Sequence, residues 1–281
     1  MNKPKMILFD YGQTLVNEGK FDGVKGTQAV LKYATKNKYN RTAEEIQAVA
    51  DAMNQELGRF DPAKRHLFQV EVPNSMFCGY LYESQGVELS IKGAQRDKVF
   101  WDAASPGMPT EGIEEFLAFL KEQGIRTAVL SNISHCGEAL EARLQEKLPN
   151  HDFEFIIATS EYMYRKPNRR IFELALEKAD LKPEEVWYIG DNYECDVEGA
   201  RNAGLFPVWY VGATENPTEP KGEVLMVDNW EELKKMFLRN DDTLYQMLDA
   251  GIKDMESGRE LLLEEAFDKI SELRAQRREL R

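Results

Sequence analysis

The chain has 281 residues, of which 42% are hydrophobic and 30% charged. This length suits about two domains of 100 to 200 residues each, and the composition excludes disordered and fibrous classes. The formal net charge of −13 repels nucleic-acid phosphates, so we expect no nucleic acid as a partner.

The N-terminal segment is polar and leads directly into a short apolar run, without an apolar stretch of signal-peptide length. Nowhere does the chain have an apolar span of about 18 residues, so we expect no membrane partner. Cys78, Cys136 and Cys195 are scattered without paired spacing, which indicates neither disulfides nor a zinc cluster. We therefore expect a soluble, cytoplasmic protein.

Short apolar runs alternate with helical patterns along most of the chain. The first run, Met6–Phe9, predicts a strand that is buried on both faces and ends at Asp10. Further predicted strands are Thr127–Leu130, Phe153–Ala158, Val186–Ile189, Phe206–Tyr210 and Val224–Val227, and predicted helices begin near Ile113, at Pro167 and at Asn229, the last ending at Leu238. This alternation predicts an α/β fold with a doubly wound, parallel, Rossmann-like sheet.

About ninety residues separate the first strand from the helix near Ile113, far more than a normal connection. Thr42 and Glu45 form a capping-box pattern that precedes apolar positions at helical spacing. We expect residues 18–105 to form an inserted, mostly helical domain, and residues 1–17 and 106–239 to form the α/β core.

The last part of the chain has a different pattern. Residues 240–281 contain no proline and carry apolar residues at helical spacing. The sequence therefore predicts a C-terminal helical extension, which could mediate self-association or bind a protein partner.

Several polar residues follow predicted strands, where a doubly wound sheet opens its ligand crevice. Asp10, Ser131, Lys166, Asp191 and Asp196 together supply a carboxylate nucleophile, a hydroxyl donor, a cation and carboxylates for a metal. These are the groups that phosphoryl transfer requires, and the expected substrate is a small phosphorylated molecule.

The motifs at these positions resemble those of the haloacid dehalogenase superfamily of hydrolases, in the same order. They are Asp10–Leu15 (DYGQTL), Ser131 with Asn132, Lys166 with Pro167, and Gly190–Asp196 (GDNYECD). The resemblance covers about residues 5 to 230. It implies that the inserted domain is a helical cap that closes over the site and selects the substrate.

The resemblance also assigns roles to the residues that would bind and attack phosphate. It makes Asp10 the nucleophile that becomes an aspartyl-phosphate, and Ser131 a donor to phosphate oxygens. Asn132 would lie in the same substrate-binding loop. Lys166 would neutralise both Asp10 and the transferring group.

A Mg²⁺ cofactor follows from the same resemblance. Its ligands would be the carboxylates of Asp10 and Asp191 and the backbone carbonyl of Gly12. Asp196 would act in catalysis by orienting Lys166 or the water shell of the metal.

Residue 12 departs from the phosphatase pattern of this superfamily, which has there an aspartate that protonates the leaving alcohol. Gly12 has no proton to give, and the loss of such assistance costs roughly 10² to 10⁴ in rate. The protein could remain a phosphatase with an acid from elsewhere, such as Gln13, Glu18 or a residue of the inserted domain. Two alternatives are a non-catalytic phosphate- or phosphoprotein-binding protein and a metal-independent 2-haloacid dehalogenase. For the phosphatase, Gly12→Asp is expected to raise turnover.

Overall fold

The computed structural model describes residues 3–59, 69–214 and 220–238. The described residues up to Lys234 form one compact unit, and residues 235–238 belong to a second. In the second unit, residues 235–238 are described and helical. The predicted extension at 240–281 lies outside the described residues.

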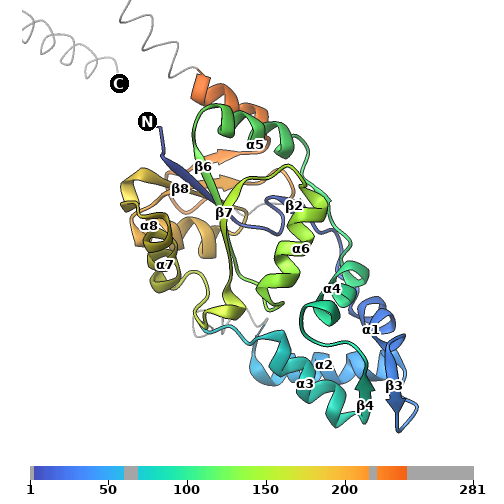
Figure 1. Ribbon diagram of the computed structural model, residues 1–281. Coiled ribbons are helices and arrows are strands. Elements are labelled where there is room, and N and C mark those ends of the chain that lie inside the picture. Colours follow the sequence, from blue (N-terminus) through green and yellow to red (C-terminus); the bar gives the residue numbers. More distant parts are fainter. Residues whose placement is uncertain (1–2, 60–68, 215–219, 239–281) are drawn as a thin grey trace, which may run out of the picture. The chain divides into compact units, whose positions relative to one another are not determined.

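A six-stranded sheet, parallel throughout, lies at the centre of the first unit (Figure 1). In sheet order, the strands are β10 (Leu225–Val227), β9 (Phe206–Tyr210), β8 (Val186–Gly190), β1 (Met6–Phe9), β6 (Arg126–Ser131) and β7 (Phe153–Ala158). The predicted α/β, doubly wound, Rossmann-like sheet is therefore confirmed.

Strand β1 lies in the middle of the sheet and is buried on both faces, as its unbroken apolar sequence predicts. Met6 and Leu8 belong to a core that also contains residues of α7 (Arg169–Ala179) and α8 (Gly199–Ala203). On the other face, the ring of Phe9 lies 6.4 Å from that of Phe116 on α5 (Ile113–Glu122). Figure 1 shows α7 and α8 on one side of the sheet and α5 on the other.

The predicted start of helix α7 at Pro167 is wrong by two residues. The helix begins at Arg169, because the side chain of Asn168 accepts a hydrogen bond from the backbone N–H of Arg170 and caps it. The predicted helix start at Asn229 is supported by its side chain, which accepts a hydrogen bond from Glu232 N at 2.8 Å.

Residues 18–105, here called the inserted segment, contain α1 (Gly23–Leu31), α2 (Ala43–Leu57), α3 (Asn74–Ser84) and α4 (Gly93–Ala104). The capping box at the start of α2 is present, with Glu45 N donating to Thr42 Oγ1 and Thr42 N donating to Glu45 Oε2. Two strands that the sequence did not predict, β3 (Ala34–Asn37) and β4 (Val87–Leu89), pair antiparallel.

The inserted segment has an apolar core of its own, formed by residues such as Val30, Ile46, Phe77 and Leu81. Its two ends meet at a short antiparallel pair, β2 (Val16–Asn17) with β5 (Met108–Pro109). The chain therefore leaves and re-enters the α/β part beside the loop that follows β1.

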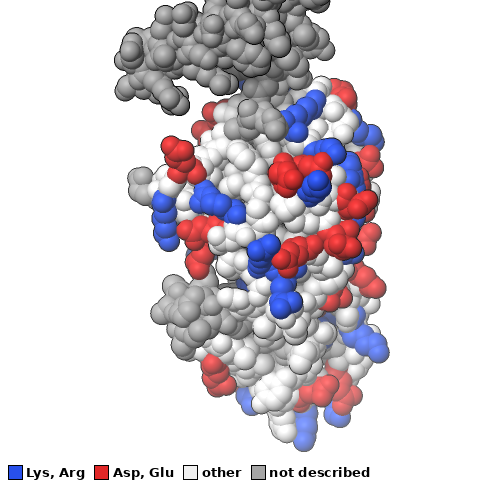
Figure 2. All heavy atoms as spheres, turned by 90° about the vertical axis from the view of Figure 1, so that its left-hand side faces the viewer, with Lys and Arg blue, Asp and Glu red and all other residues white. Residues whose placement is uncertain are grey.

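Among the described residues, no helix has the length and apolar character needed to cross a membrane. On the face shown in Figure 2, Lys and Arg side chains lie interspersed with Asp and Glu side chains. Such mixed charge is typical of a surface in contact with water.

Candidate active site

Three of the predicted site residues lie at the carboxyl-terminal edge of the sheet. Asp10 directly follows β1, and its backbone N–H donates to Ile189 O on β8 at 2.8 Å. Ser131 is the last residue of β6 and is buried, and Asp191 directly follows β8. Because β1 lies between β6 and β8, the folding of the sheet brings these three strand ends together.

Lys166 lies in the centre of the acidic residues, with only 1% of its side chain exposed. Its Nζ is 3.0 Å from Asp10 Oδ1 and donates to Asp196 Oδ1 at 2.6 Å. It also donates to the Tyr188 hydroxyl at 2.6 Å. Burial alone would lower the pKa of Lys166, but the carboxylates of Asp10 and Asp196 raise it above its ordinary value, so the ammonium stays charged.

Asn132 holds the backbone of Lys166 on both sides. Its Oδ1 accepts from Lys166 N at 2.7 Å, and its Nδ2 donates to Lys166 O at 2.8 Å. Both polar atoms of this side chain are thus engaged with Lys166, and the loop after β6 fixes the backbone from which the ammonium extends.

Asp10, Asp191 and Asp196 form a cluster in which one oxygen from each lies within 4.8 Å of the others. Burial, reinforced by the neighbouring carboxylates, raises the pKa of Asp191 and of Asp196. Asp10 Oδ1 is buried, and its contact with Lys166 Nζ at 3.0 Å is an ion pair without hydrogen-bond geometry. Because a hard divalent cation prefers carboxylate oxygens and would relieve this repulsion, the residues fit Mg²⁺.

Asp196 differs from the other two carboxylates because both of its oxygens already accept hydrogen bonds. Oδ1 accepts from Lys166, and Oδ2 accepts from Asn192 N at 2.9 Å. The carboxylate of Asp196 can lie this close to the end of β8 only because residue 190 is glycine. A β-carbon at residue 190 would lie only 2.3 Å from Asp196 Oδ2. The residue at the end of β8 must therefore be glycine.

The loop after β1 turns back on itself and brings Glu18 beside Gly12. Gly12 forms a bridge with Val16, two residues before Glu18. A β-carbon at residue 12 would lie 3.1 Å from Glu18 Oε2. Burial and the charge of Asp10 raise the pKa of Glu18, opposed by the hydrogen bond from Trp101 and the charge of Arg143.

Trp101 and Arg143 are neighbours of the site that the sequence did not identify. Arg143 lies on α6 (Gly137–Lys147), is fully buried, and donates through Nε to the Tyr11 hydroxyl at 3.0 Å. The ring of Tyr11 lies 5.3 Å from that of Trp101, which stacks on His135 at 4.4 Å. Arg143 and Tyr11 are 132 residues apart, so no local pattern could have indicated their contact.

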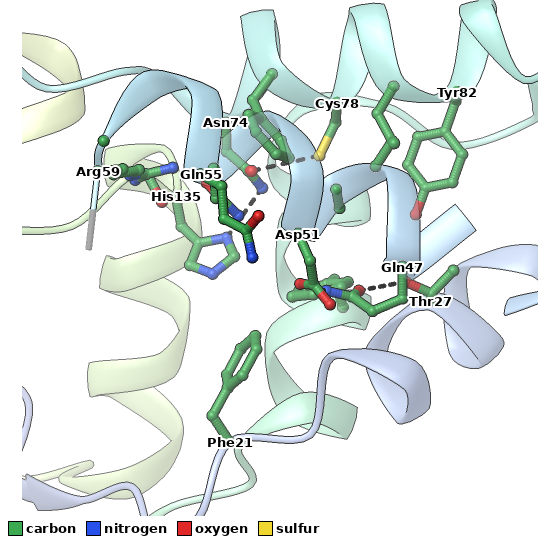
Figure 3. A pocket seen from close by; sticks show the side chains of 17 residues that line it. Phe21, Thr27, Gln47, Asp51, Gln55, Arg59, Asn74, Cys78, Tyr82 and His135 are labelled. Atoms are coloured by element: carbon green, nitrogen blue, oxygen red, sulfur yellow. Dashed lines mark hydrogen bonds between the residues drawn. The ribbon is translucent and has the colours of Figure 1, made fainter. Parts of the chain in front are cut away.

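A cavity of about 940 Å³ lies next to this row of rings (Figure 3). Most of its lining residues belong to the inserted segment, and Ser134 and His135 follow β6. Figure 3 shows the amides of Gln47 and Gln55 and the carboxylate of Asp51 along it, with Phe21 nearby. The cavity thus offers both hydrogen-bonding groups and apolar surface.

Curated proteins of known name are similar to parts of this chain. A human haloacid dehalogenase-like hydrolase domain-containing protein 3 is 34% identical over 36% of this chain and 39% of its own length. A glyceraldehyde 3-phosphate phosphatase of Methanothermobacter thermautotrophicus is 31% identical over 42% and 53%. A phosphoserine phosphatase of Thermus thermophilus is 34% identical over 38% and 42%. The chain thus spans about two fifths to one half of the length of these relatives.

Solved structures share the fold over most of the chain. A 2-haloacid dehalogenase from Pseudomonas syringae has a TM-score of 0.59 at 18% identity, covering 84% of this chain and 99% of that chain. An HAD phosphatase from Thermococcus onnurineus has a TM-score of 0.58 at 20% identity, covering 83% and 97%. A family model described as haloacid dehalogenase-like hydrolase matches residues 4–204, and the chain therefore belongs to this family.

Proposed function

We propose that this protein is a Mg²⁺-dependent phosphatase that acts on a small phosphorylated metabolite through an aspartyl-phosphate on Asp10. The observation that carries the proposal is the placement of Lys166 Nζ within 3.0 Å of Asp10 and 2.6 Å of Asp196. A buried ammonium beside a carboxylate nucleophile lets an anionic substrate approach without prohibitive repulsion.

The residues around Asp10 then divide the work of phosphoryl transfer. The Asp10 carboxylate attacks phosphorus, and the Lys166 ammonium balances the charge of the transferring group. Ser131, at the end of β6, donates a hydrogen bond from its hydroxyl to a phosphate oxygen. Asn132 contributes to substrate binding because its side chain holds the backbone of Lys166 in place.

Asp10 and Asp191, with the backbone carbonyl of Gly12, would hold Mg²⁺. Bound there, the ion supplies positive charge that stabilises the phosphate oxygens. Asp196 is a positioning residue, since its two oxygens are engaged with Lys166 and the backbone of Asn192.

The division of the chain supports a substrate-selecting role for the inserted segment. Residues 18–105 would be a cap over a core formed by residues 1–17 and 106–239. Residues 240–281, which lie outside the described residues, would mediate self-association or bind a protein partner. The cavity of about 940 Å³ would bind the alcohol portion of the substrate, which is the leaving group of the reaction. The named phosphatase relatives support a small phosphorylated metabolite as the substrate. The free thiols of the three cysteines support a location in the cytoplasm, where thiols stay reduced.

A screen of phosphate monoesters with and without Mg²⁺ tests this proposal. We expect Mg²⁺-dependent phosphate release that disappears in Asp10→Asn, with Asp180→Asn, an exposed aspartate after α7, as the matched control. Equal release by the wild-type protein and Asp10→Asn contradicts the proposal.

Two other measurements distinguish the alternative functions from a phosphatase. Halide release from 2-haloacids without metal would indicate a dehalogenase, although the three clustered carboxylates favour a cation site. Retention of fluoroberyllate without turnover of any ester would indicate a phosphate-binding protein.

A further inference from the structure

We propose that Glu18 is the proton donor of the reaction, in place of the side chain that Gly12 lacks. This inference rests on the phosphatase function proposed above, since it assigns one more catalytic residue to that reaction. It accounts for how a hydrolase can work with glycine two positions after its nucleophile.

The position of the Glu18 carboxylate carries the argument. Its Oε2 lies 3.1 Å from the point where a β-carbon of residue 12 would stand. The space that an acidic side chain at residue 12 would enter is therefore occupied by the carboxyl group of Glu18. The bridge between Gly12 and Val16 holds the loop in the turn that produces this approach.

Neighbouring residues hold Glu18 so that one oxygen is anchored and the other is presented to the site. Trp101 Nε1 donates to Oε1 at 2.6 Å, and Arg143 Nη2 lies 3.7 Å from the same oxygen. The backbone is also held, because Ser105 Oγ donates to Glu18 O at 2.6 Å. Oε2 remains on the side of Gly12, and a fixed carboxyl group of this kind is suited to proton transfer.

Glu18 also has access to solvent. Its side chain is 24% exposed, against 12% for Asp10, so its carboxyl group can exchange protons with water between turnovers. The other nearby side chains are less suited to the role. Gln13 carries an amide, which has no acidic proton, and the indole N–H of Trp101 is committed to Glu18.

The proton balance of the two steps is as follows. Asp10 attacks phosphorus, the bond from phosphorus to the leaving oxygen breaks, and that oxygen takes the proton of the Glu18 carboxyl group to leave as an alcohol. Water then attacks the aspartyl-phosphate and gives a proton to the Glu18 carboxylate, while the bond from phosphorus to Asp10 breaks. Inorganic phosphate leaves, and both carboxyl groups return to their starting states.

Leaving groups of matched shape test the role of Glu18. The substrates are p-nitrophenyl phosphate, whose leaving group departs readily without a proton, and phenyl phosphate, whose leaving group needs one. We expect Glu18→Gln to lower kcat/KM for phenyl phosphate by about 10²-fold or more, and for p-nitrophenyl phosphate by less than about tenfold. Glu115→Gln, an exposed residue on α5, is the control and should match the wild-type protein on both esters.

Adding Gly12→Asp supplies a rescue. In a Glu18→Ala background, where no side chain of that length occupies the space beside residue 12, it should raise kcat/KM on phenyl phosphate at least tenfold. In the wild-type background the gain should be small, because Glu18 already fills the place and crowds a side chain at residue 12.

The outcomes separate this inference from the phosphatase function. If Asp10→Asn abolishes hydrolysis of both esters but Glu18→Gln lowers both equally or neither, the role of Glu18 is overturned and the phosphatase function stands. If the wild-type protein hydrolyses neither ester faster than Asp10→Asn does, the function and this inference are overturned together.

Discussion

Lys166 and Asp196 form an ion pair of 2.6 Å in which each side chain is only 1% exposed. Lys166 also faces Asp10, so the pair with Asp196 determines where the ammonium lies relative to the nucleophile. Breaking a buried pair leaves the remaining charge without its partner, and the Lys166 ammonium would then be held only by Asp10 and the Tyr188 hydroxyl.

Asp196→Asn should therefore reduce catalysis without abolishing Mg²⁺ binding. The amide keeps an acceptor for Lys166 but loses the negative charge, and we expect kcat/KM on p-nitrophenyl phosphate to fall by about 10- to 100-fold. Steady-state kinetics over a range of Mg²⁺ concentrations measures both effects, with Asp180→Asn as the control. A loss of Mg²⁺ affinity as large as that of Asp191→Asn would show that Asp196 is itself a ligand.

Asp191→Asn should remove the stabilisation that Mg²⁺ gives to the folded protein. A ligand at 100 times its Kd stabilises the fold by about 2.7 kcal/mol, which thermal unfolding detects. Without metal, the variant should be at least as stable as the wild-type protein, because it has one fewer carboxylate in a crowded, buried cluster. An undiminished Mg²⁺ shift in this variant would exclude Asp191 as a ligand. Glu115→Gln is the control.

The sheet and most of the candidate site could be predicted because their signals are local. Met6–Phe9 is an unbroken apolar run and forms β1 as predicted, and the parallel sheet then brings Asp10 and Asp191 to one edge. The start of α7 was missed because the N-cap Asn168, one residue beyond the predicted start at Pro167, was not recognised. Strands β3 and β4 were missed because each is short and has exposed residues, two of four in β3 and one of three in β4.

Contacts between distant residues could not be predicted from the sequence. The sequence raised Glu18 as one of several substitutes for the acid absent at residue 12, but only the folded loop puts its carboxylate beside Gly12. The contacts of Trp101 with Glu18 and of Arg143 with Tyr11 join residues 83 and 132 positions apart. Such pairings depend on how distant parts of the chain pack together, which no local spacing encodes.

His135 should make the fold less stable in mild acid. Burial and the charges of nearby arginines, opposed by Asp97, lower the pKa of His135 from 6.5 to about 4. Between these values an unfolded chain binds a proton that the folded protein does not, so stability falls as the pH drops from 6.5 toward 4. The loss should amount to about 2 to 3 kcal/mol.

Urea unfolding at several pH values measures this loss. His135→Gln should flatten the dependence between about pH 6.5 and 4, because glutamine does not titrate. His151→Gln is the comparison, since burial also lowers the pKa of that histidine, which lies beside Phe153 and away from the site. An unchanged slope in His135→Gln would mean that other groups cause the acid sensitivity.

Arg143→Leu should destabilise the packing of the inserted segment on α6. The guanidinium of Arg143 is fully buried, pairs with Asp102, and donates to Ser105 O at 2.8 Å and to the Tyr11 hydroxyl at 3.0 Å. Leucine leaves these acceptors without a donor, although 35% of the Asp102 side chain is exposed and can be hydrated. We therefore expect a loss of about 2 to 4 kcal/mol in the free energy of unfolding.

Arg126→Leu is the matched control for this loss, because Arg126 pairs with Glu154 at 2.6 Å but both side chains are more than a third exposed. Its removal should cost less than about 1 kcal/mol, as for other surface ion pairs. Arg143→Lys should fall between the two, since a lysine keeps the charge but cannot reach Asp102, Ser105 and Tyr11 with one planar group. Equal losses in Arg143→Leu and Arg126→Leu would show that burial of Arg143 contributes nothing specific to how the inserted segment is held on α6.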